Sequence, residues 1–305
     1  MRRIALATLA ASLFLAGCGG SDSDSAGLDD VKVSKSASPK VTVDKGFKAT
    51  KTSTKVLNQG SGDVLAAGDT VKVKYVAVNG RTGKQFDSSF TADKPLVITL
   101  SSDAILPGFV KGLEGQKVGS RILVAIPPKD GFGAAQANLD LKKNDTMVFL
   151  FDVVAKVPTE ATGTSAALPK DLPKLQLDSD KHPSKFTKTK STEAKQTKSS
   201  SQVVIEGKGD EVKADQTLTV QYLGQVYPSG EVFDSSWTRG APSSFTLTEG
   251  SLIKCWTDEL VGQRVGSRVV LVCPAKVAYD DKPPDGSVIK AGDTLVFAID
   301  LLDAS

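Results

Sequence analysis

The residues of this chain that could do chemistry are chiefly aromatic side chains, with a few carboxylates near them. His182 is the only histidine in the 305 residues. A Ser–His–Asp arrangement is therefore excluded unless His182 serves in it, and so is a metal site that needs two imidazoles. The acidic residues that follow position 279 lack the spacing of a calcium loop. We expect no metal and no cofactor, so function must rest on the aromatic residues and the elements that position them.

These aromatic residues occur twice, at an offset of 147 positions, and the offset shifts to 148 only near the end of the second copy. Such a constant offset indicates a duplication, and two copies are too few for a solenoid. Each copy should therefore be a domain that folds by itself. The matched pairs are Tyr75 and Tyr222, Phe86 and Phe233, Phe109 and Trp256, Phe132 and Tyr279, and Phe149 and Phe297.

Each copy is predicted to be mostly strand with one short helix, which is an α+β domain. Apolar residues alternate with polar ones over 71–75 and 218–222, which indicates strands with one buried face. Further strands are expected at 121–126, 146–154, 268–273 and 294–302. Spacings of three and four, over 106–113 and again over 253–260, predict one face of a short helix.

Composition sets the segment boundaries around these two domains. Residues 19–45 and 158–201 are rich in small and charged residues, which favours flexible chain. Lysines from 181 to 198 are interpreted as a solvated spacer, with contact to an anionic lipid surface as the alternative. The expected segments are a signal peptide at 1–17, a tether at 18–45, a first domain at 46–157 with its core at 68–157, a linker at 158–180, and a second domain at 181–305 with its core at 215–305.

The N-terminus has the pattern of an export signal. Arg2 and Arg3 precede 14 uncharged residues, a run that suits a signal peptide and is too short to span a bilayer. The run ends in Leu-Ala-Gly-Cys18, which resembles the lipobox of bacterial lipoproteins, so Cys18 is the expected lipidation site. A plain secretory signal is the alternative. We therefore expect a lipid-anchored protein on the extracytoplasmic face of the cell membrane. Without Arg2 and Arg3, 36 basic residues stand against 35 acidic ones, which gives no electrostatic case for nucleic acid.

In each copy a tyrosine is followed by Phe-Asp-Ser-Ser, by an apolar pair before a helical aromatic, by a proline-led loop that ends in an aromatic, and by a Thr-x-Val-Phe strand. This order closely resembles the FKBP-type peptidyl-prolyl cis–trans isomerases, over about 90 residues per copy. The resemblance implies two tandem FKBP-like domains, each a curved antiparallel sheet wrapped around one short helix. In each domain a shallow apolar pocket would lie between the sheet and the helix.

The resemblance assigns the second copy a nearly complete site. Trp256 would form the pocket floor, Tyr279 would offer its hydroxyl to a substrate carbonyl, and Asp234 would lie at the rim with Arg239 as its partner. Ser243 stands at a position that is usually aromatic in the family. The expected catalytic residues are Tyr222, Phe233, Asp234, Ile253, Trp256, Tyr279 and Phe297.

The first copy departs further from the family. Phe109 replaces the tryptophan, Phe132 the hydroxyl-bearing tyrosine, Leu96 the wall aromatic and Ala92 the arginine. This pocket is expected to bind proline, and its catalysis is in question. The expected substrate-binding residues are Tyr75, Phe86, Asp87, Leu106, Phe109, Phe132 and Phe149.

The function that follows is isomerisation of Xaa-Pro bonds in proline-containing exported polypeptides, with the second domain as the more active one. Amide resonance sets a barrier of about 18–20 kcal/mol, and an apolar site disfavours the planar imide more than the twisted transition state. The alternative is a lipid-anchored module that binds proline segments as a chaperone with little catalysis. A ligand-binding lipoprotein of a transporter is less well supported, because each pocket lies within one small domain. The sequence leaves the oligomeric state open.

Cys255 and Cys273 remain as a pair once Cys18 is acylated. In an exported domain such a pair is a possible disulfide, with two buried free thiols as the alternative.

Overall fold

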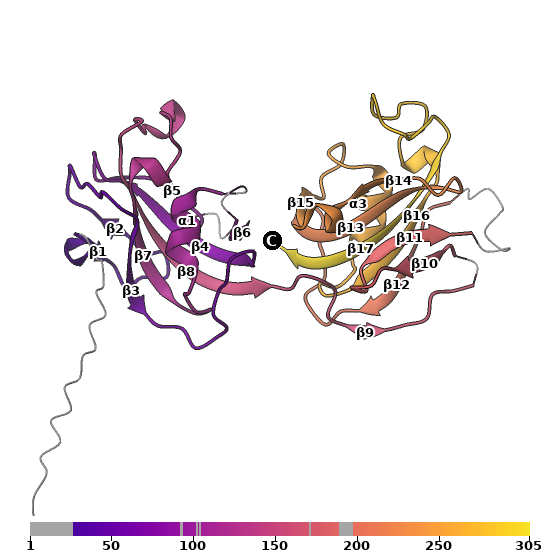
Figure 1. Cartoon of the computed structure of the whole chain (residues 1–305), viewed down its shortest axis with the longest axis horizontal. Helices are drawn as coiled ribbons and strands as arrows, with labels where there is room; N and C mark the ends of the chain where they lie inside the picture. Colours follow the sequence, from indigo (N-terminus) through magenta and orange to yellow (C-terminus); the bar gives the residue numbers. More distant parts are fainter. Residues whose placement is uncertain (1–26, 92–93, 102, 104, 171, 189–197) are drawn as a thin grey trace, which may run out of the picture.

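Two antiparallel sheets of the same topology form the body of the chain in a computed structural model, which describes residues 27–305 except 92–93, 102, 104, 171 and 189–197. Figure 1 shows the two sheets side by side, the first in indigo to magenta and the second in orange to yellow. The expected fold class, two tandem domains of curved antiparallel sheet with short helices, is confirmed.

The first sheet has the order β3-β7-β8-β4-β5, and β6 also pairs with β4. Its strand β7 has the bounds that the sequence predicts. Two 3-10 turns, η2 (Pro128–Asp130) and η3 (Ala137–Leu139), interrupt the long loop before β8. The elements are β3 (Ser53–Asn58), β4 (Thr70–Asn79), β5 (Lys84–Ser88), β6 (Leu96–Thr99), α1 (Pro107–Leu113), β7 (Arg121–Ile126) and β8 (Met147–Val157).

The second sheet repeats this order as β12-β16-β17-β13-β14, with β15 on β13 and the extra strand β9 (Thr164–Ser165) beside β12. A second short helix, α2, follows β14, where the sequence predicted only one helix per domain. The elements are β12 (Ser200–Glu206), β13 (Thr217–Tyr227), β14 (Val232–Ser235), α2 (Ser236–Arg239), β15 (Ser243–Thr246), α3 (Lys254–Leu260), β16 (Arg268–Cys273), η5 (Ala275–Val277) and β17 (Thr294–Ala304).

The inner face of each sheet packs against its helix. Along β7, Ile122, Val124 and Ile126 belong to the inner core, whereas the intervening Leu123 and Ala125 belong to an outer one. This alternation follows from the two-residue period of a strand. Because both faces of β7 are buried, its residues form an almost continuous apolar run.

The outer face of the first sheet is covered by the segment that the sequence assigned to a flexible tether. Residues 27–45 contain η1 (Leu28–Asp30), β1 (Lys32–Val33) and β2 (Val41–Thr42), and the two strands pair as a hairpin. Leu28 is fully buried, and Val41 and Val43 are 5% and 4% exposed. The tether prediction was wrong for these residues, because a few apolar side chains among polar ones are sufficient when a sheet face is available to bury them. Residues 18–26 lie outside the described part.

The second sheet is covered in the same way by residues that the sequence assigned to the linker, 158–180, and to the start of the second domain, from 181 onward. Strands β9 (Thr164–Ser165), β10 (Lys174–Leu177) and β11 (Pro183–Thr187) lie in this region, and β9 pairs with β12. Phe186 is 1% exposed in the outer core. The side chain of Gln225 is fully buried; its Oε1 accepts from the Phe186 N–H at 2.7 Å, and its Nε2 donates to the Phe186 carbonyl at 2.9 Å. The repeated unit therefore includes an outer hairpin as well as the sheet and helix.

The two domains meet near the C-terminal end of β17, which lies between them in Figure 1. There Lys72 of β4 donates to both carboxylate oxygens of Asp303 in β17, at 2.9 and 3.0 Å. Both side chains are more than four-fifths buried. This ion pair joins the first sheet directly to the second.

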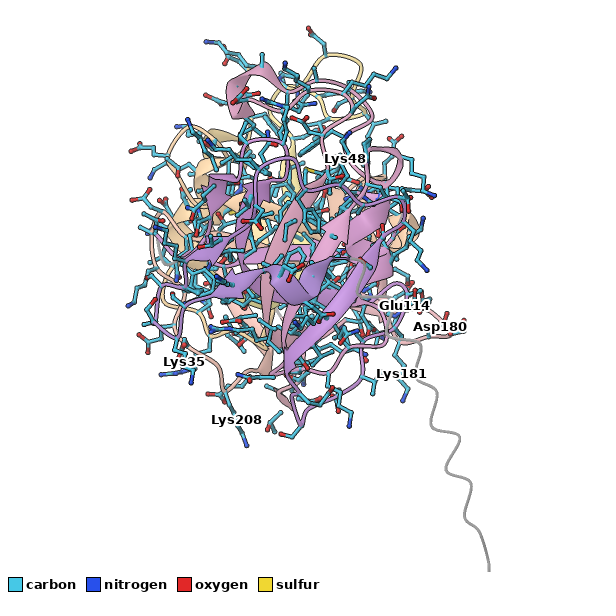
Figure 2. The ribbon with its side chains drawn as sticks, turned by 90° about the vertical axis from the view of Figure 1, so that its left-hand side faces the viewer. Lys35, Lys48, Glu114, Asp180, Lys181 and Lys208 are labelled. Atoms are coloured by element: carbon cyan, nitrogen blue, oxygen red, sulfur yellow. A yellow bond between two sulfur atoms is a disulfide. The ribbon has the colours of Figure 1, made fainter. Side chains whose placement is uncertain are left out.

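Many charged side chains lie at the surface. In Figure 2, Lys35 and Lys208 project at the lower left of the molecule, and Glu114 and Asp180 lie on its right-hand side. None of the helices in the described residues is long and apolar enough to cross a membrane.

Candidate active site

The second domain has a cavity of about 460 Å³ between α3, the strands β13 to β15 and the loop that follows β16. Its lining includes every residue that the sequence assigned to the second site. These residues are Tyr222, Phe233, Asp234, Ile253, Trp256, Tyr279 and Phe297.

Trp256 forms the floor of this pocket. It occupies the first turn of α3, is 4% exposed, and is packed edge-on by three rings. The ring centroids of Tyr222, Phe245 and Phe297 lie 5.7, 5.4 and 5.4 Å from that of Trp256. Edge-to-face packing at these distances is favourable, so the indole has one well-determined position.

Three side chains form a polar rim. The Tyr222 hydroxyl donates to Asp234, and Arg239 donates to the other oxygen of the same carboxylate. The Arg239 Nη2 also donates to the Tyr222 hydroxyl at 3.1 Å, and its guanidinium lies 5.5 Å from the centre of that ring. Burial raises the pKa of Tyr222 to about 12, with Asp234 adding to the shift and Arg239 opposing it. The phenol therefore stays protonated, and the Asp234 charge is balanced by Arg239.

Tyr279 lies across the pocket on the loop after β16. The 3-10 turn η5 forms this loop, and the Ala278 N–H donates to the carbonyls of Pro274 and Ala275 at 3.1 and 2.9 Å. Burial and then the nearby Asp234 carboxylate raise the pKa of Tyr279. Its hydroxyl is thus a neutral group at physiological pH, able to donate to a ligand carbonyl.

One wall of the pocket differs from the expectation. The sequence analysis placed Ser243 at the usually aromatic wall position, but Phe245, two residues later on the same face of β15, lines the cavity. Ser243 Oγ instead accepts from Arg239 Nη2 at 3.0 Å. In the first copy the wall contains Ile98 as well as Leu96. The two-residue period of the strand was the signal that could have identified Phe245.

The first domain has a cavity of about 550 Å³ at the equivalent place, and its lining also includes every residue that the sequence assigned to it. Its floor is Phe109, which packs edge-on against Phe149 at 4.9 Å and Phe151 at 5.1 Å. The predicted residues in this lining are Tyr75, Phe86, Asp87, Leu106, Phe109, Phe132 and Phe149.

The rim of the first pocket has fewer polar groups. The Tyr75 hydroxyl donates to Asp87 at 2.6 Å. Burial, and then this hydrogen bond, raise the pKa of Tyr75. Phe132, which is 40% exposed, stands where the second copy has Tyr279 and offers no hydroxyl. Ala92, at the position matching Arg239, lies outside the described residues, and its side chain has no positive charge.

Cys255 and Cys273 form a disulfide, with their Cα atoms 5.7 Å apart. Both are fully buried, and the bond joins α3 to the last residue of β16. The third cysteine, Cys18, lies outside the described residues.

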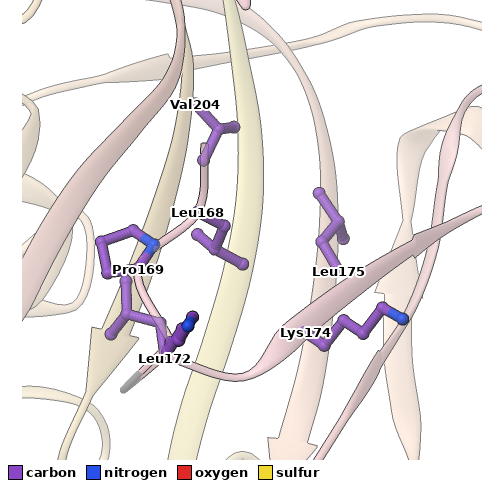
Figure 3. A pocket seen from close by; sticks show the side chains of 7 residues that line it. Leu168, Pro169, Leu172, Lys174, Leu175 and Val204 are labelled. Atoms are coloured by element: carbon purple, nitrogen blue, oxygen red, sulfur yellow. The ribbon is translucent and has the colours of Figure 1, made fainter. Parts of the chain in front are cut away.

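A third cavity, of about 560 Å³, lies on the outer side of the second domain (Figure 3). Among the described residues its lining is aliphatic apart from Lys170 and Lys174, and it contains no aromatic ring and no hydroxyl group. This composition is unlike that of the two pockets above. Its lining residues are Leu168, Pro169, Lys170, Leu172, Lys174, Leu175 and Val204.

Comparison with known proteins gives one family for both halves of the chain. A family model described as FKBP-type peptidyl-prolyl cis-trans isomerase matches residues 62–154 and again 208–302. An "FK506-binding protein" of Streptomyces anulatus is 42% identical over 99 residues, 32% of this chain and 80% of that protein. A "Probable FKBP-type peptidyl-prolyl cis-trans isomerase" of Haemophilus influenzae is 27% identical over 248 residues, 80% of this chain and 90% of that protein. The crystal structure of FkpA from Escherichia coli is 39% identical with a TM-score of 0.32, and the match covers 35% of this chain and 48% of that one.

Proposed function

The chain belongs to the FKBP-type peptidyl-prolyl cis–trans isomerase family, and we propose that its second pocket is the main catalytic site. The family model matches more than half of the chain, so isomerase activity towards proline-containing polypeptides is the premise. One observation supports the choice of pocket. The second cavity contains both an indole floor, Trp256, and a hydroxyl, Tyr279, whereas the first has Phe109 and Phe132 at these positions.

The pocket would act by differential binding. Rotation about an Xaa-Pro bond has a barrier of about 18–20 kcal/mol, because amide resonance is lost at the twisted geometry. The twisted imide is less polar than the planar one, so an apolar cavity lined by Trp256, Phe233 and Phe297 disfavours the ground state more than the transition state. Tyr279 would donate to a substrate carbonyl and hold the peptide in place. Such a hydrogen bond contributes about 0.5–1.5 kcal/mol.

The polar rim would orient the peptide outside the prolyl ring. Because the Tyr222 hydroxyl and Arg239 both donate to Asp234, this carboxylate is held in one position at the cavity edge. A fixed dipole costs no reorganisation when the imide twists. Proton transfer by Asp234 is not part of this mechanism, since no bond to hydrogen changes during isomerisation.

The first pocket would bind proline segments and turn them over slowly. It retains the apolar lining and the Tyr75–Asp87 hydrogen bond, which are sufficient to accommodate a prolyl ring. It lacks the second hydroxyl at Phe132. A chaperone-like binding module with little catalysis is therefore the second candidate function, and the absent hydroxyl in this pocket is the observation that favours it.

We further propose that the protein is exported, anchored through a lipid on Cys18, and assists the folding of exported polypeptides. Support comes from Arg2 and Arg3, the uncharged run after them and the lipobox-like Leu-Ala-Gly-Cys18. The Cys255–Cys273 disulfide agrees with an oxidising compartment. Labelling of cells with a radioactive fatty acid tests this proposal. Incorporation should disappear in Cys18→Ser, and label that persists in this variant would contradict it.

Matched substitutions in the full chain test which pocket is catalytic. Tyr279→Ala and Phe132→Ala remove equivalent side chains from the two loops, and neither side chain is in the fully buried core. Isomerisation of a short Xaa-Pro peptide should slow about tenfold in Tyr279→Ala and change little in Phe132→Ala. The reverse result would assign catalysis to the first pocket. If the full-length protein is folded but has no isomerase activity, the second candidate function, a module that binds proline segments, would be favoured.

A further inference from the structure

The Cys255–Cys273 disulfide lies directly beneath the proposed catalytic pocket. Cys255 precedes the pocket floor Trp256 in α3, and Cys273 precedes Pro274, where the loop that positions Tyr279 begins. The bond therefore links the two elements that supply the floor and the hydroxyl of the second pocket. Both cysteines are fully buried, so the bond forms part of the packing between helix and strand.

The first domain shows what this joint is like without a disulfide. Gly108 and Ile126 stand at the positions of Cys255 and Cys273, at the repeat offset of 147. A Cβ atom placed on Gly108 would lie 2.4 Å from Ile126 Cγ2, closer than real Cβ atoms come to a neighbour. Here the isoleucine side chain fills the space against bare helix backbone. The same joint is thus packed in one copy and cross-linked in the other.

We propose that the disulfide is a positioning element for isomerisation in the second domain, and that its reduction lowers the activity of that domain. This inference rests on the proposal that the second pocket is catalytic. A dithiol such as dithiothreitol supplies two electrons and two protons: the Sγ–Sγ bond breaks, two thiols form, and the dithiol becomes a cyclic disulfide. Non-bonded heavy atoms stay about 3.5–4.0 Å apart, so two thiols cannot lie as close as two bonded sulfurs.

Separation of the sulfurs must move α3 or the end of β16. Either movement shifts Trp256 relative to Tyr279, the two groups that would contact opposite sides of the bound prolyl segment. Misplacement by about 1 Å at a catalytic site can cost up to about a hundredfold in rate. The first pocket has no cysteine at this joint, so its ligand binding should not respond to a reductant.

The test compares oxidised and reduced forms of the full chain carrying Cys18→Ser, so that every thiol counted comes from this pair. Reduction should expose two thiols per chain and lower kcat/KM for a short Xaa-Pro peptide about tenfold. The kcat should fall more than KM rises, because apolar contacts to the substrate survive while its orientation is lost. Cys255→Ser/Cys273→Ser should reproduce the reduced value in the absence of reductant.

A second variant separates positioning from mere stability. Cys255→Gly/Cys273→Ile copies the joint of the first domain, so it should have kcat/KM near that of the oxidised protein and should not respond to dithiothreitol. Unchanged activity after complete reduction would overturn the inference, and so would reduction that unfolds the whole second domain. An oxidised protein that is folded but inactive would instead contradict the proposed function, which keeps the two failures apart.

Discussion

The two domains have apolar pockets at equivalent places and differ most in the polar groups around them. Phe149 and Phe297 occupy equivalent walls. Each packs edge-to-face with the floor ring of its pocket, with ring centroids 4.9 and 5.4 Å apart. At the rim, Tyr222 shares Asp234 with an arginine, whereas Tyr75 holds Asp87 with one hydrogen bond. The shape of the pocket is thus determined by the core, which both copies need in order to fold, while the polar groups at the pocket edge differ between the copies.

An ion pair that is present in both domains extends this comparison. Arg121 and Asp152 form a two-bond ion pair across β7 and β8, with side chains 23% and 26% exposed. The equivalent Arg268 and Asp300 are 6% and 0% exposed. Two neighbours cover this pair: the Ala161 N–H, in the segment before β9, donates to Asp300 at 2.8 Å, and the Trp237 ring centre lies 5.9 Å from the Arg268 guanidinium. The pair is thus partly exposed in the first domain and almost fully buried in the second.

The largest expected effect comes from breaking this buried pair. Asp300→Asn leaves Arg268 buried without its counter-charge, and removing one partner of a buried pair typically costs about 3–5 kcal/mol. Asp152→Asn, the matched control, should cost less than Asp300→Asn, because the Arg121–Asp152 pair is partly exposed and water partly screens it. Urea unfolding followed by tryptophan fluorescence measures the first variant, since Trp237 and Trp256 both lie in the second domain. Circular dichroism follows the second. Equal costs would show that the cover does not desolvate Asp300.

A smaller loss of stability is expected where a buried amide holds the outer hairpin. Gln225 makes both of its hydrogen bonds to the backbone of Phe186, and its counterpart in the first copy is Val78. Gln225→Val copies that residue and leaves two buried backbone groups unpaired, which should cost about 2–3 kcal/mol. Urea unfolding followed by tryptophan fluorescence again measures the change in the free energy of unfolding. A neutral result would mean that water replaces the amide.

These two predictions concern features that sequence reasoning did not find. The strands 121–126 and 268–273 could be predicted with their bounds, because runs of β-branched residues between turns carry local information. The segments that cover the outer faces of the two sheets could not be predicted. Leu28 and Phe186 are buried only through contacts with strands distant in sequence. Phe245 was missed because the alignment to the family pattern placed the wall two residues too early.

The cysteine pair shows the same limit. An even number of cysteines in an exported domain permits a disulfide, but the spacing in sequence says nothing about the distance in space. The bond depends on α3 crossing the end of β16, which brings the two Cα atoms within 5.7 Å. In the candidate sites, by contrast, the fourteen residues that the family resemblance implied all line the two cavities, because a family pattern carries tertiary information that a single segment lacks.

Exchanging one hydroxyl between the pockets tests the catalytic comparison directly. Tyr279→Phe should lower kcat/KM about two- to tenfold, which corresponds to a lost hydrogen bond of about 0.5–1.5 kcal/mol. Phe132→Tyr should raise the contribution of the first pocket, measured in the background of Tyr279→Phe so that the gain is visible. If kcat/KM does not fall in Tyr279→Phe and does not rise when Phe132→Tyr is added, the loop hydroxyl is not the cause of a difference in activity between the two domains.

The smallest effect concerns the rim and appears only at high pH. The pKa of Tyr222 is raised from 10.0 to about 12 in the folded protein, whereas an unfolded tyrosine ionises near 10. The stability linked to this shift is therefore fully present below pH 10 and is lost as pH rises towards 12. Tyrosinate absorbance of the folded protein minus that of Tyr222→Phe should titrate well above pH 10. Arg239→Ala should move the midpoint higher, because Arg239 opposes the shift. A midpoint near 10 in the parent protein would mean that Asp234 and burial do not hold this proton.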